Sequence, residues 1–286
     1  MYTLKIENAA GEIFELTHNR SNYSLTKVTG LTPPAANINT SAAGTIDGTF
    51  FNSARVNQRN IVLYITLEGD IEANRQNLYR IFPIKSPCTV YFRNEHFDVK
   101  IDGYVEIVDG DLFSMREQMQ VSIICPHPYW TALSQVAYEL STVVKMFSFP
   151  FSIAESPGVP MSEYTVSPVI SIINDGSVPC GFTATIEFTG TVSGFKLVNA
   201  TTQKYFGFLP SLQFQAGDVL EISTVSGELY ARVTRSGAIV SIMNSLDGDS
   251  EWLKLALGEN RLSYTISGDM DDVDISIDPA LLYAGV

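Results

Sequence analysis

The feature that most constrains this fold is a repeated alternation of apolar and polar residues in short runs. In the run 118–124, Met119, Val121 and Ile123 alternate with polar residues, as expected of a strand with one wet face. Comparable runs lie at 182–188, 253–257, 262–266 and 273–277, and residues that favour turns separate them. The sequence therefore predicts a mainly β protein.

One segment departs from this pattern and predicts a helix over 70–82. Asp70 is a favourable N-cap, and Pro83 ends the helix because it lacks an amide hydrogen. Three apolar residues recur at roughly helical spacing and predict one buried stripe, namely Ile71, Leu78 and Phe82. A single helix among strands must cover a sheet or close the end of a barrel, so we expect it to act as a structural brace.

The length of the chain, 286 residues, predicts two domains. The motif Cys125–Trp130 holds two prolines in three residues, which ends any strand ladder. We place an N-terminal β domain with one helix at 1–128, a linker or bridging strand at 129–156, and a C-terminal β-sandwich of jelly-roll type at 157–286.

The segment 30–60 has few apolar residues and contains consecutive prolines, Pro33 and Pro34, which cannot join the interior of a sheet. Within it, 37–53 predicts an exposed loop or a projecting hairpin. Two interpretations stay open for 30–60, a mobile loop and an element that contacts other subunits.

Composition and charge exclude several classes of protein. The net charge is −13 with only 18 Lys plus Arg and no basic run, which argues against specific nucleic-acid binding. The N-terminus lacks the apolar core of a signal peptide, and no apolar run reaches the roughly 20 residues that span a bilayer. We expect a protein that is made in the cytosol and stays soluble there, is not secreted by a signal peptide, and does not insert into a membrane.

The residue types needed for catalysis are present, but their positions do not predict an active site. Three histidines fall in expected loops or turns, His18, His96 and His127, and no Gly-x-Ser-x-Gly elbow exists. Asp70 and Glu72 suit a helix start better than glycoside cleavage. Cys88, Cys125 and Cys180 are odd in number and widely spaced, which favours buried free thiols over disulfides or zinc. We predict no enzyme and no cofactor.

Two surface features are candidates for ligand binding in the second domain. Asp272 and Asp274 belong to an acidic run that offers hard oxygen ligands to calcium, although the pattern favours the charged wet face of an edge strand over a calcium site. Tyr205, Phe208 and Trp252 are aromatic residues on which a sugar could stack, although most aromatic residues in a sandwich belong to its core.

Three stretches resemble the distal tail protein (Dit) family of long-tailed, non-contractile phages. The first is a strand followed by Gly69-Asp70 and a helix with Arg75, Leu78-Tyr79 and Phe82-Pro83. The second is the closing motif Cys125–Trp130, with His127 where the family often carries Asp. The third covers most of the C-terminal half, at 174–176, 216–222, 250–253, 257–260 and 283–286.

The resemblance implies an N-terminal β-sandwich with one helix and a projecting hairpin. It also implies that six copies of the chain form a ring at the tail tip. The helix residues Asp70, Ile71, Arg75, Leu78, Tyr79 and Phe82 would then belong to the ring-forming domain. The second domain would be a sandwich of galectin-like or carbohydrate-binding-module type outside the ring. The ring would join the tail-tube protein to tail-tip or baseplate proteins, with tape-measure or receptor-binding proteins as further candidate partners.

A rival hypothesis from a different class is a free carbohydrate-binding protein of two β domains that recognises a host surface saccharide. A third is a subunit of a cell-wall hydrolase. The sequence leaves open whether the particle is an infectious phage, a prophage product or a bacteriocin.

Overall fold

A computed structural model describes residues 2–16, 22–42, 44, 47–111, 117–133, 137–139, 141–145, 162–166 and 169–286. The chain forms two compact units. Unit 1 contains residues 1–134 together with 282–286, and unit 2 contains 135–281. The expected boundary near residue 128 thus lies a few residues later, and the last five residues, which we expected in the second domain, pack with the first.

Unit 1 is built on one nine-stranded sheet. Its main path runs in the order β2 (Ile13–Leu16), β1 (Thr3–Asn8), β7 (Pro87–Arg93), β8 (Asp98–Gly110), β9 (Gln118–Cys125), β6 (Arg59–Leu67) and β3 (Tyr23–Thr29). Two short strands extend it beside β8, namely β10 (Trp130–Ala132) and β24 (Leu282–Tyr283). All of these pairs are antiparallel.

The sheet of unit 1 folds back on itself around a shared core. The first half of β8 pairs with β7 and its second half pairs with β9, with Tyr104 common to both ladders. The end strands β2 and β3 meet through Phe14 and Tyr23, whose rings contact edge to face at 5.2 Å. The N-terminal β-sandwich that the resemblance implied is therefore confirmed, and it arises from one folded sheet.

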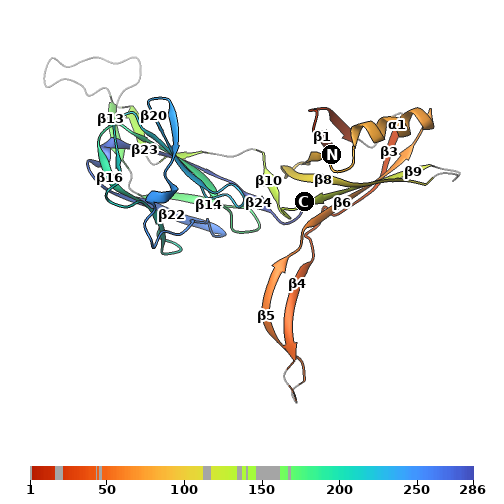
Figure 1. Ribbon diagram of the computed structural model, residues 1–286, viewed down its shortest axis with the longest axis horizontal. Helices are drawn as coiled ribbons and strands as arrows, with labels where there is room; N and C mark the ends of the chain where they lie inside the picture. The colour runs from red at the N-terminus through yellow and green to blue at the C-terminus, as the bar shows by residue number, and fades with distance from the viewer. Residues whose placement is uncertain are drawn as a thin grey trace. The chain divides into compact units, whose positions relative to one another are not determined.

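The helix α1 (Ile71–Ile81) packs on this core, as Figure 1 shows. Leu78 is fully buried, Phe82 just beyond the helix is 1% exposed, and the Phe82 ring meets Phe14 edge to face at 5.8 Å. Ile71 was wrongly placed in the apolar stripe, since 37% of its surface is exposed. The buried face instead begins at Asn74 and continues through Leu78 and Ile81, the i, i+4 and i+7 positions of a helix.

Strands β4 (Ala36–Ala42) and β5 (Thr49–Val56) pair only with each other and form a hairpin that projects from unit 1 (Figure 1). This confirms the projecting hairpin predicted within 30–60. All residues of both strands are exposed.

Unit 2 is a sandwich of a six-stranded and a five-stranded sheet. The first has the order β11 (Tyr138–Glu139), β23 (Val273–Pro279), β15 (Phe182–Phe188), β19 (Val219–Ser223), β20 (Tyr230–Arg235) and β21 (Ala238–Ser241). The second contains β14 (Val169–Asn174), β22 (Gly258–Ser267), β16 (Val192–Asn199), β17 (Lys204–Gly207) and β18 (Gln213–Phe214). Three smaller features complete the unit, the pair β12 (Ser141–Lys145) and β13 (Ser162–Val166) and the single turns η1 (Met243–Ser245) and η2 (Met270–Asp272).

The core of unit 2 joins its two sheets through aromatic rings. Phe188 of the six-stranded sheet stacks on Phe214 with ring centroids 4.4 Å apart and meets Phe195 edge to face at 6.1 Å. All three side chains are buried. The predicted C-terminal β-sandwich is confirmed. Part of the expected bridging strand, 146–156, lies outside the described residues.

Candidate functional site

The β4–β5 hairpin has one apolar and one polar face. Side chains alternate along a strand, and directly paired residues share a face. The register therefore gathers Ala36, Val56, Ile38, Ala54, Thr40, Phe51, Ala42 and Thr49 on one side. We call this side the apolar face.

Polar side chains dominate the opposite side. Asn39 Nδ2 donates to Ser53 Oγ at 3.0 Å, and Ser41 Oγ donates to Asn52 Oδ1 at 3.2 Å. Asn37 and Arg55 pair on the same side. On the apolar face the exposed fractions reach 60% for Ile38, 67% for Phe51 and 40% for Val56. The hairpin thus presents apolar area that nothing in unit 1 covers.

Arg59, at the start of β6, holds the base of the hairpin. It is 1% exposed, and its guanidinium donates only to backbone carbonyls within the described structure. Nη1 bonds Leu31 O at 3.1 Å, Thr32 O at 2.8 Å and also Gly30 O, while Nε bonds Pro128 O at 2.8 Å. Burial lowers the Arg59 pKa from its usual value.

The same guanidinium also binds the returning end of the chain. Its Nη2 donates to Ala284 O, and its carbon lies 5.5 Å from the centre of the Trp130 ring. Trp130 in turn pairs with Tyr283 across β10 and β24. One buried cation therefore joins 30–32, 128 and 284, which are distant in sequence.

Two glycines permit this close packing. Gly30 has φ +87°, and a Cβ there would lie 2.0 Å from Asn60 O. A Cβ on Gly285 would lie 2.5 Å from Pro33 Cδ, and the next residue, Val286, donates its backbone N–H to Leu31 O at 3.2 Å. The two strands of the hairpin are thus exposed, and its base is held by buried contacts.

The helix residues singled out in the sequence have structural roles. Asp70 is the N-cap, because its carboxylate accepts from the Ala73 amide at 3.2 Å. Arg75, whose side chain is only 19% exposed, pairs with the exposed Glu72 one turn earlier in the helix. Tyr79 is 39% exposed, whereas Leu78 and Phe82 are buried. The helix therefore offers an exposed outer face around Ile71 and Tyr79.

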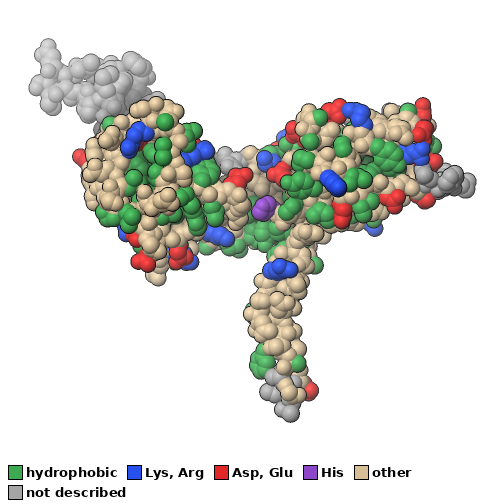
Figure 2. Space-filling model, in the orientation of Figure 1, with side chains coloured by type: hydrophobic (Ala, Val, Ile, Leu, Met, Phe, Trp, Pro, Cys, Tyr) green, Lys and Arg blue, Asp and Glu red, His purple; other side chains and the backbone are tan. Residues whose placement is uncertain are grey.

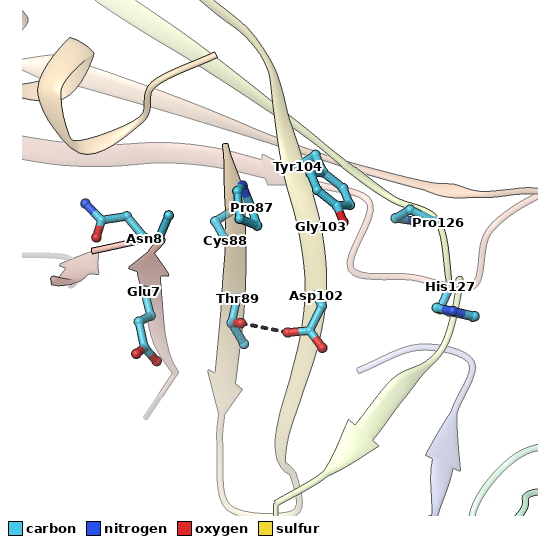
Figure 3. A pocket seen from close by; sticks show the side chains of 11 residues that line it. Glu7, Asn8, Pro87, Cys88, Thr89, Asp102, Gly103, Tyr104, Pro126 and His127 are labelled. Atoms are coloured by element: carbon cyan, nitrogen blue, oxygen red, sulfur yellow. Dashed lines mark hydrogen bonds between the residues drawn. The ribbon is translucent and has the colours of Figure 1, made fainter. Parts of the chain in front are cut away.

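An open cleft of about 430 Å³ lies in unit 1 between β1, β7, β8 and the closing motif (Figure 3). Both of its carboxylates have partners: Asp102 accepts from Thr89 Oγ1 at 2.6 Å, and Glu7 accepts from Tyr91 Oη at 2.7 Å. Burial raises the pKa of Cys88, which also lines the cleft, to about 12. The thiol is therefore protonated at neutral pH and a poor nucleophile.

The other two cysteines and the described histidines do not form a thiol–imidazole pair in this cleft. Cys125 and Cys180 are buried free thiols whose pKa values burial raises to about 12 and about 11. The prediction of buried free thiols is confirmed. His127 lines the cleft, His96 lies in the turn between β7 and β8, and His18 is outside the described residues.

The aromatic residues proposed for glycan contact have unequal access to solvent. Phe208 is fully buried against Phe206 and Phe214, so it offers no surface to a sugar, which corrects that assignment. Trp252 is half-buried, and its ring lies 4.8 Å from that of Phe206.

The third aromatic, Tyr205, belongs to a surface cluster. Its ring lies 4.5 Å from Lys196 Nζ, and its hydroxyl donates to Asp247 at 3.2 Å. The hydrogen bond from Lys196, at 2.8 Å, lowers the Asp247 pKa. Tyr205 and Trp252 are therefore the two proposed aromatics with accessible surface.

The acidic candidates for calcium lie at the start of β23. Asp272 ends the turn η2, and Asp274 faces Glu187 across the ladder with β15. Strand β23 is not an edge strand, contrary to expectation, because β11 pairs with its other side at Ser276 and Ile277. In the part of the chain that the structure describes, no three His, Cys, Asp or Glu side chains gather as metal ligands would.

No helix in the described ranges combines the length and hydropathy needed to cross a bilayer.

Comparison with known proteins now tests the resemblance. The family profile described as siphovirus-type tail component, C-terminal domain, matches residues 175–279. The fold of the whole chain is similar to that of the Dit protein of phage SPP1, with a TM-score of 0.67 at 13% identity over 98% of both chains. The resemblance to the distal tail proteins is confirmed.

Two further structures are similar to the chain and come from the phage P2 baseplate in its activated conformation. One, with calcium, gives a TM-score of 0.52 at 11% identity, and the other, with strontium, 0.52 at 10%. Each match covers 97% of this chain and 98% of the other. The SPP1 structure is described as a paradigm of the hub adsorption apparatus in phages that infect Gram-positive bacteria. No curated protein matches the chain in sequence.

Sequence reasoning missed Arg59 and the tail 282–286, although both hold the base of the hairpin. Arg59 begins a strongly apolar strand, where a buried cation is unusual, and that contrast was the available signal. The partners of Arg59 are backbone carbonyls, which carry no sequence signal.

Proposed function

We propose that this chain is a structural, non-catalytic component of a siphophage tail tip, where it forms a hexameric ring. The single observation that carries the proposal is the likeness in fold to SPP1 Dit over 98% of both chains, joined to the family match at 175–279. A tail-tip role also agrees with the likeness to chains of the P2 baseplate.

In this proposal the two units have different roles. Unit 1 builds the ring, because it carries the projecting hairpin, and ring closure needs two different complementary patches on each subunit. Unit 2, the galectin-like sandwich, serves as a mount for other tail proteins. The partners would be the tail-tube protein on one side of the ring and tail-tip, tape-measure or receptor-binding proteins on the other.

The net negative charge of the chain agrees with a ring through which DNA passes. DNA must pass through a tail, and a net charge of −13 disfavours adhesion of phosphates to the ring. The chain would be made in the bacterial cytoplasm and incorporated into the tail tip.

The alternative, a free saccharide-binding protein, rests on the accessible Tyr205 and Trp252. Their surroundings weaken it, because Asp247 is already engaged by Lys196 and Tyr205, and Phe208 is buried. Replacing Trp252 by Ala should leave tail assembly intact under our proposal.

Labelling of tailed particles tests the proposal. Antibodies against the purified chain should bind at the end of the tail distal to the head, as seen by electron microscopy of particles from the bacterium that carries this gene. Label along the tail tube, or label only on free protein, would contradict it.

A further inference from the structure

The apolar face of the hairpin requires a partner. Isolated two-stranded hairpins are at best marginally stable in water, and no described residue of unit 1 covers the strands of this one. Ile38 and Phe51 are each exposed by 60% or more and lie on the same face. Exposure of contiguous apolar side chains in this arrangement is typical of a protein–protein contact.

The hairpin also restricts the chemistry of that partner. Over 36–56 the only charged residues are Asp47 near the tip and Arg55 on the polar face, and Figure 2 shows the hairpin nearly free of charged side chains. We therefore expect its partner to be a mainly apolar surface.

Unit 1 itself carries such a surface. A cleft of about 330 Å³ lies where the end strand β3 faces β1 and β2. Leu25, Val28, Leu31 and Val286 contribute half-buried apolar side chains to it, and Tyr2, 76% exposed, forms its rim. The lining also includes Lys27, whose Nζ lies 5.5 Å from the centre of the Tyr64 ring. We call this the β3 cleft.

We propose that the apolar face of the hairpin docks into the β3 cleft of a second copy of the chain. The hairpin projects away from its own unit (Figure 1), so its apolar face is available to another molecule. A protrusion and a cleft of matching chemistry on one subunit form a heterologous pair, the kind of contact that can close a ring. This inference rests on the proposed ring and specifies how its subunits join.

The hairpin is long, and the β3 cleft lies beside its base. The seven residues of β4 span roughly 23 Å at about 3.3 Å per residue. Leu31 lines the cleft, and its carbonyl also accepts from Arg59 at the hairpin base. Each subunit would thus receive a neighbour's hairpin beside the base of its own, and the contact would repeat from copy to copy.

Two adjacent phenylalanines give a matched test of the apolar face. Phe51 lies on that face and Phe50 on the polar one, with similar exposed fractions of 67% and 57%. Phe51→Asp should raise the concentration needed for assembly by at least about 100-fold, since it buries an unpaired carboxylate. Phe50→Asp should assemble as the parent chain does. Equal effects of the two changes would overturn the docking of this face.

The cleft is tested from the other side. Tyr2→Asp and Leu25→Asp should weaken assembly as Phe51→Asp does, whereas Ile84→Asp, exposed but outside the cleft, should not. Tyr2 is mostly exposed, so this change should leave the subunit folded, which circular dichroism checks. Assembly of the folded Tyr2→Asp and Leu25→Asp chains at parental concentrations would overturn the docking.

Mixing the two kinds of variant gives the sharpest result. A Phe51→Asp chain keeps its cleft, and a Tyr2→Asp chain keeps its hairpin, so the mixture should form a heterodimer and nothing larger. Absence of the heterodimer would overturn the docking. If the parent chain and the cleft variants assemble equally well, the docking is wrong but the proposed ring is not contradicted. A parent chain that stays monomeric contradicts the proposed ring as well.

Discussion

At the scale of single residues, Arg59 is the most informative side chain in unit 1. It is buried without a carboxylate partner in the described structure, and its five hydrogen bonds reach carbonyls at 30, 31, 32, 128 and 284. A guanidinium suits this position because its five N–H donors are held in a fixed planar arrangement.

Arg59→Met should therefore destabilise unit 1 by about 3 kcal/mol, because it leaves buried carbonyls without donors. Hydrogen exchange should speed up in β6, β10 and β24 and stay unchanged in unit 2. Arg59→Lys keeps the charge but has fewer donors, so the stability of unit 1 in this variant should lie between that of the parent chain and that of Arg59→Met. A Met variant with parental exchange in β10 and β24 would show that the guanidinium does not hold these segments together.

Asp218 has a comparable role in unit 2. It is 2% exposed, and Arg235 Nε donates to its two carboxylate oxygens at 2.9 and 3.1 Å. The hydrogen bond from Arg235, with further help from the Gln215 amide, lowers the Asp218 pKa.

A lowered folded pKa means that this carboxylate stabilises unit 2 above its unfolded pKa of about 3.9 and ceases to do so as pH falls through the folded value. Asp218→Asn should cost about 1–2 kcal/mol at pH 7, and the difference from the parent chain should shrink below about pH 4. Urea unfolding at several pH values measures it. A difference that stays constant down to pH 2 would contradict the role of the Asp218 charge.

At the scale of elements, the helix α1 is the brace that the sequence predicted. Its N-cap, its end before Pro83 and its buried Leu78 and Phe82 follow from local chemistry, which a sequence displays. The incorrect placement of Ile71 in the buried stripe shows that the sequence did not identify every residue of the buried face. The stripe includes Asn74, whose side chain donates to Glu68 O at 2.7 Å, and a polar residue gives no apolar signal.

Leu78→Asp should destabilise unit 1 by about 3 kcal/mol or prevent its assembly, because the charge would be buried without a partner. Its neighbour Tyr79, which is 39% exposed, provides the control, since Tyr79→Asp should leave unit 1 folded. Thermal unfolding followed by circular dichroism compares the two. An assembled ring that carries Leu78→Asp would show that α1 does not brace the core.

The hairpin was predictable as an exposed element, but its two faces were not. They depend on the register between β4 and β5, which a bulge between Asn39 and Thr40 shifts. A shift of one residue moves side chains to the other face, so alternation within each strand did not identify the paired apolar side chains. The β3 cleft was not predictable for a different reason, because Phe92 and Val286 line it together with residues from the first 31 positions of the chain.

At the scale of the whole molecule, the division into two β units was predictable from the turn signals and the closing motif. The return of 282–286 to unit 1 was not, because it depends on contacts between residues more than 200 positions apart, such as Arg59 with Ala284. The chain therefore connects its two units twice, and the second connection ends at the base of the hairpin.

The central claim is that the chain is a ring-forming tail component, and the mass of the purified full-length protein in solution tests it most directly. Light scattering and native mass spectrometry over a wide range of concentrations should give hexamers or stacked pairs of hexamers. A strictly monomeric species at high concentration would contradict the claim, and if it also bound host saccharide it would support the lectin hypothesis instead.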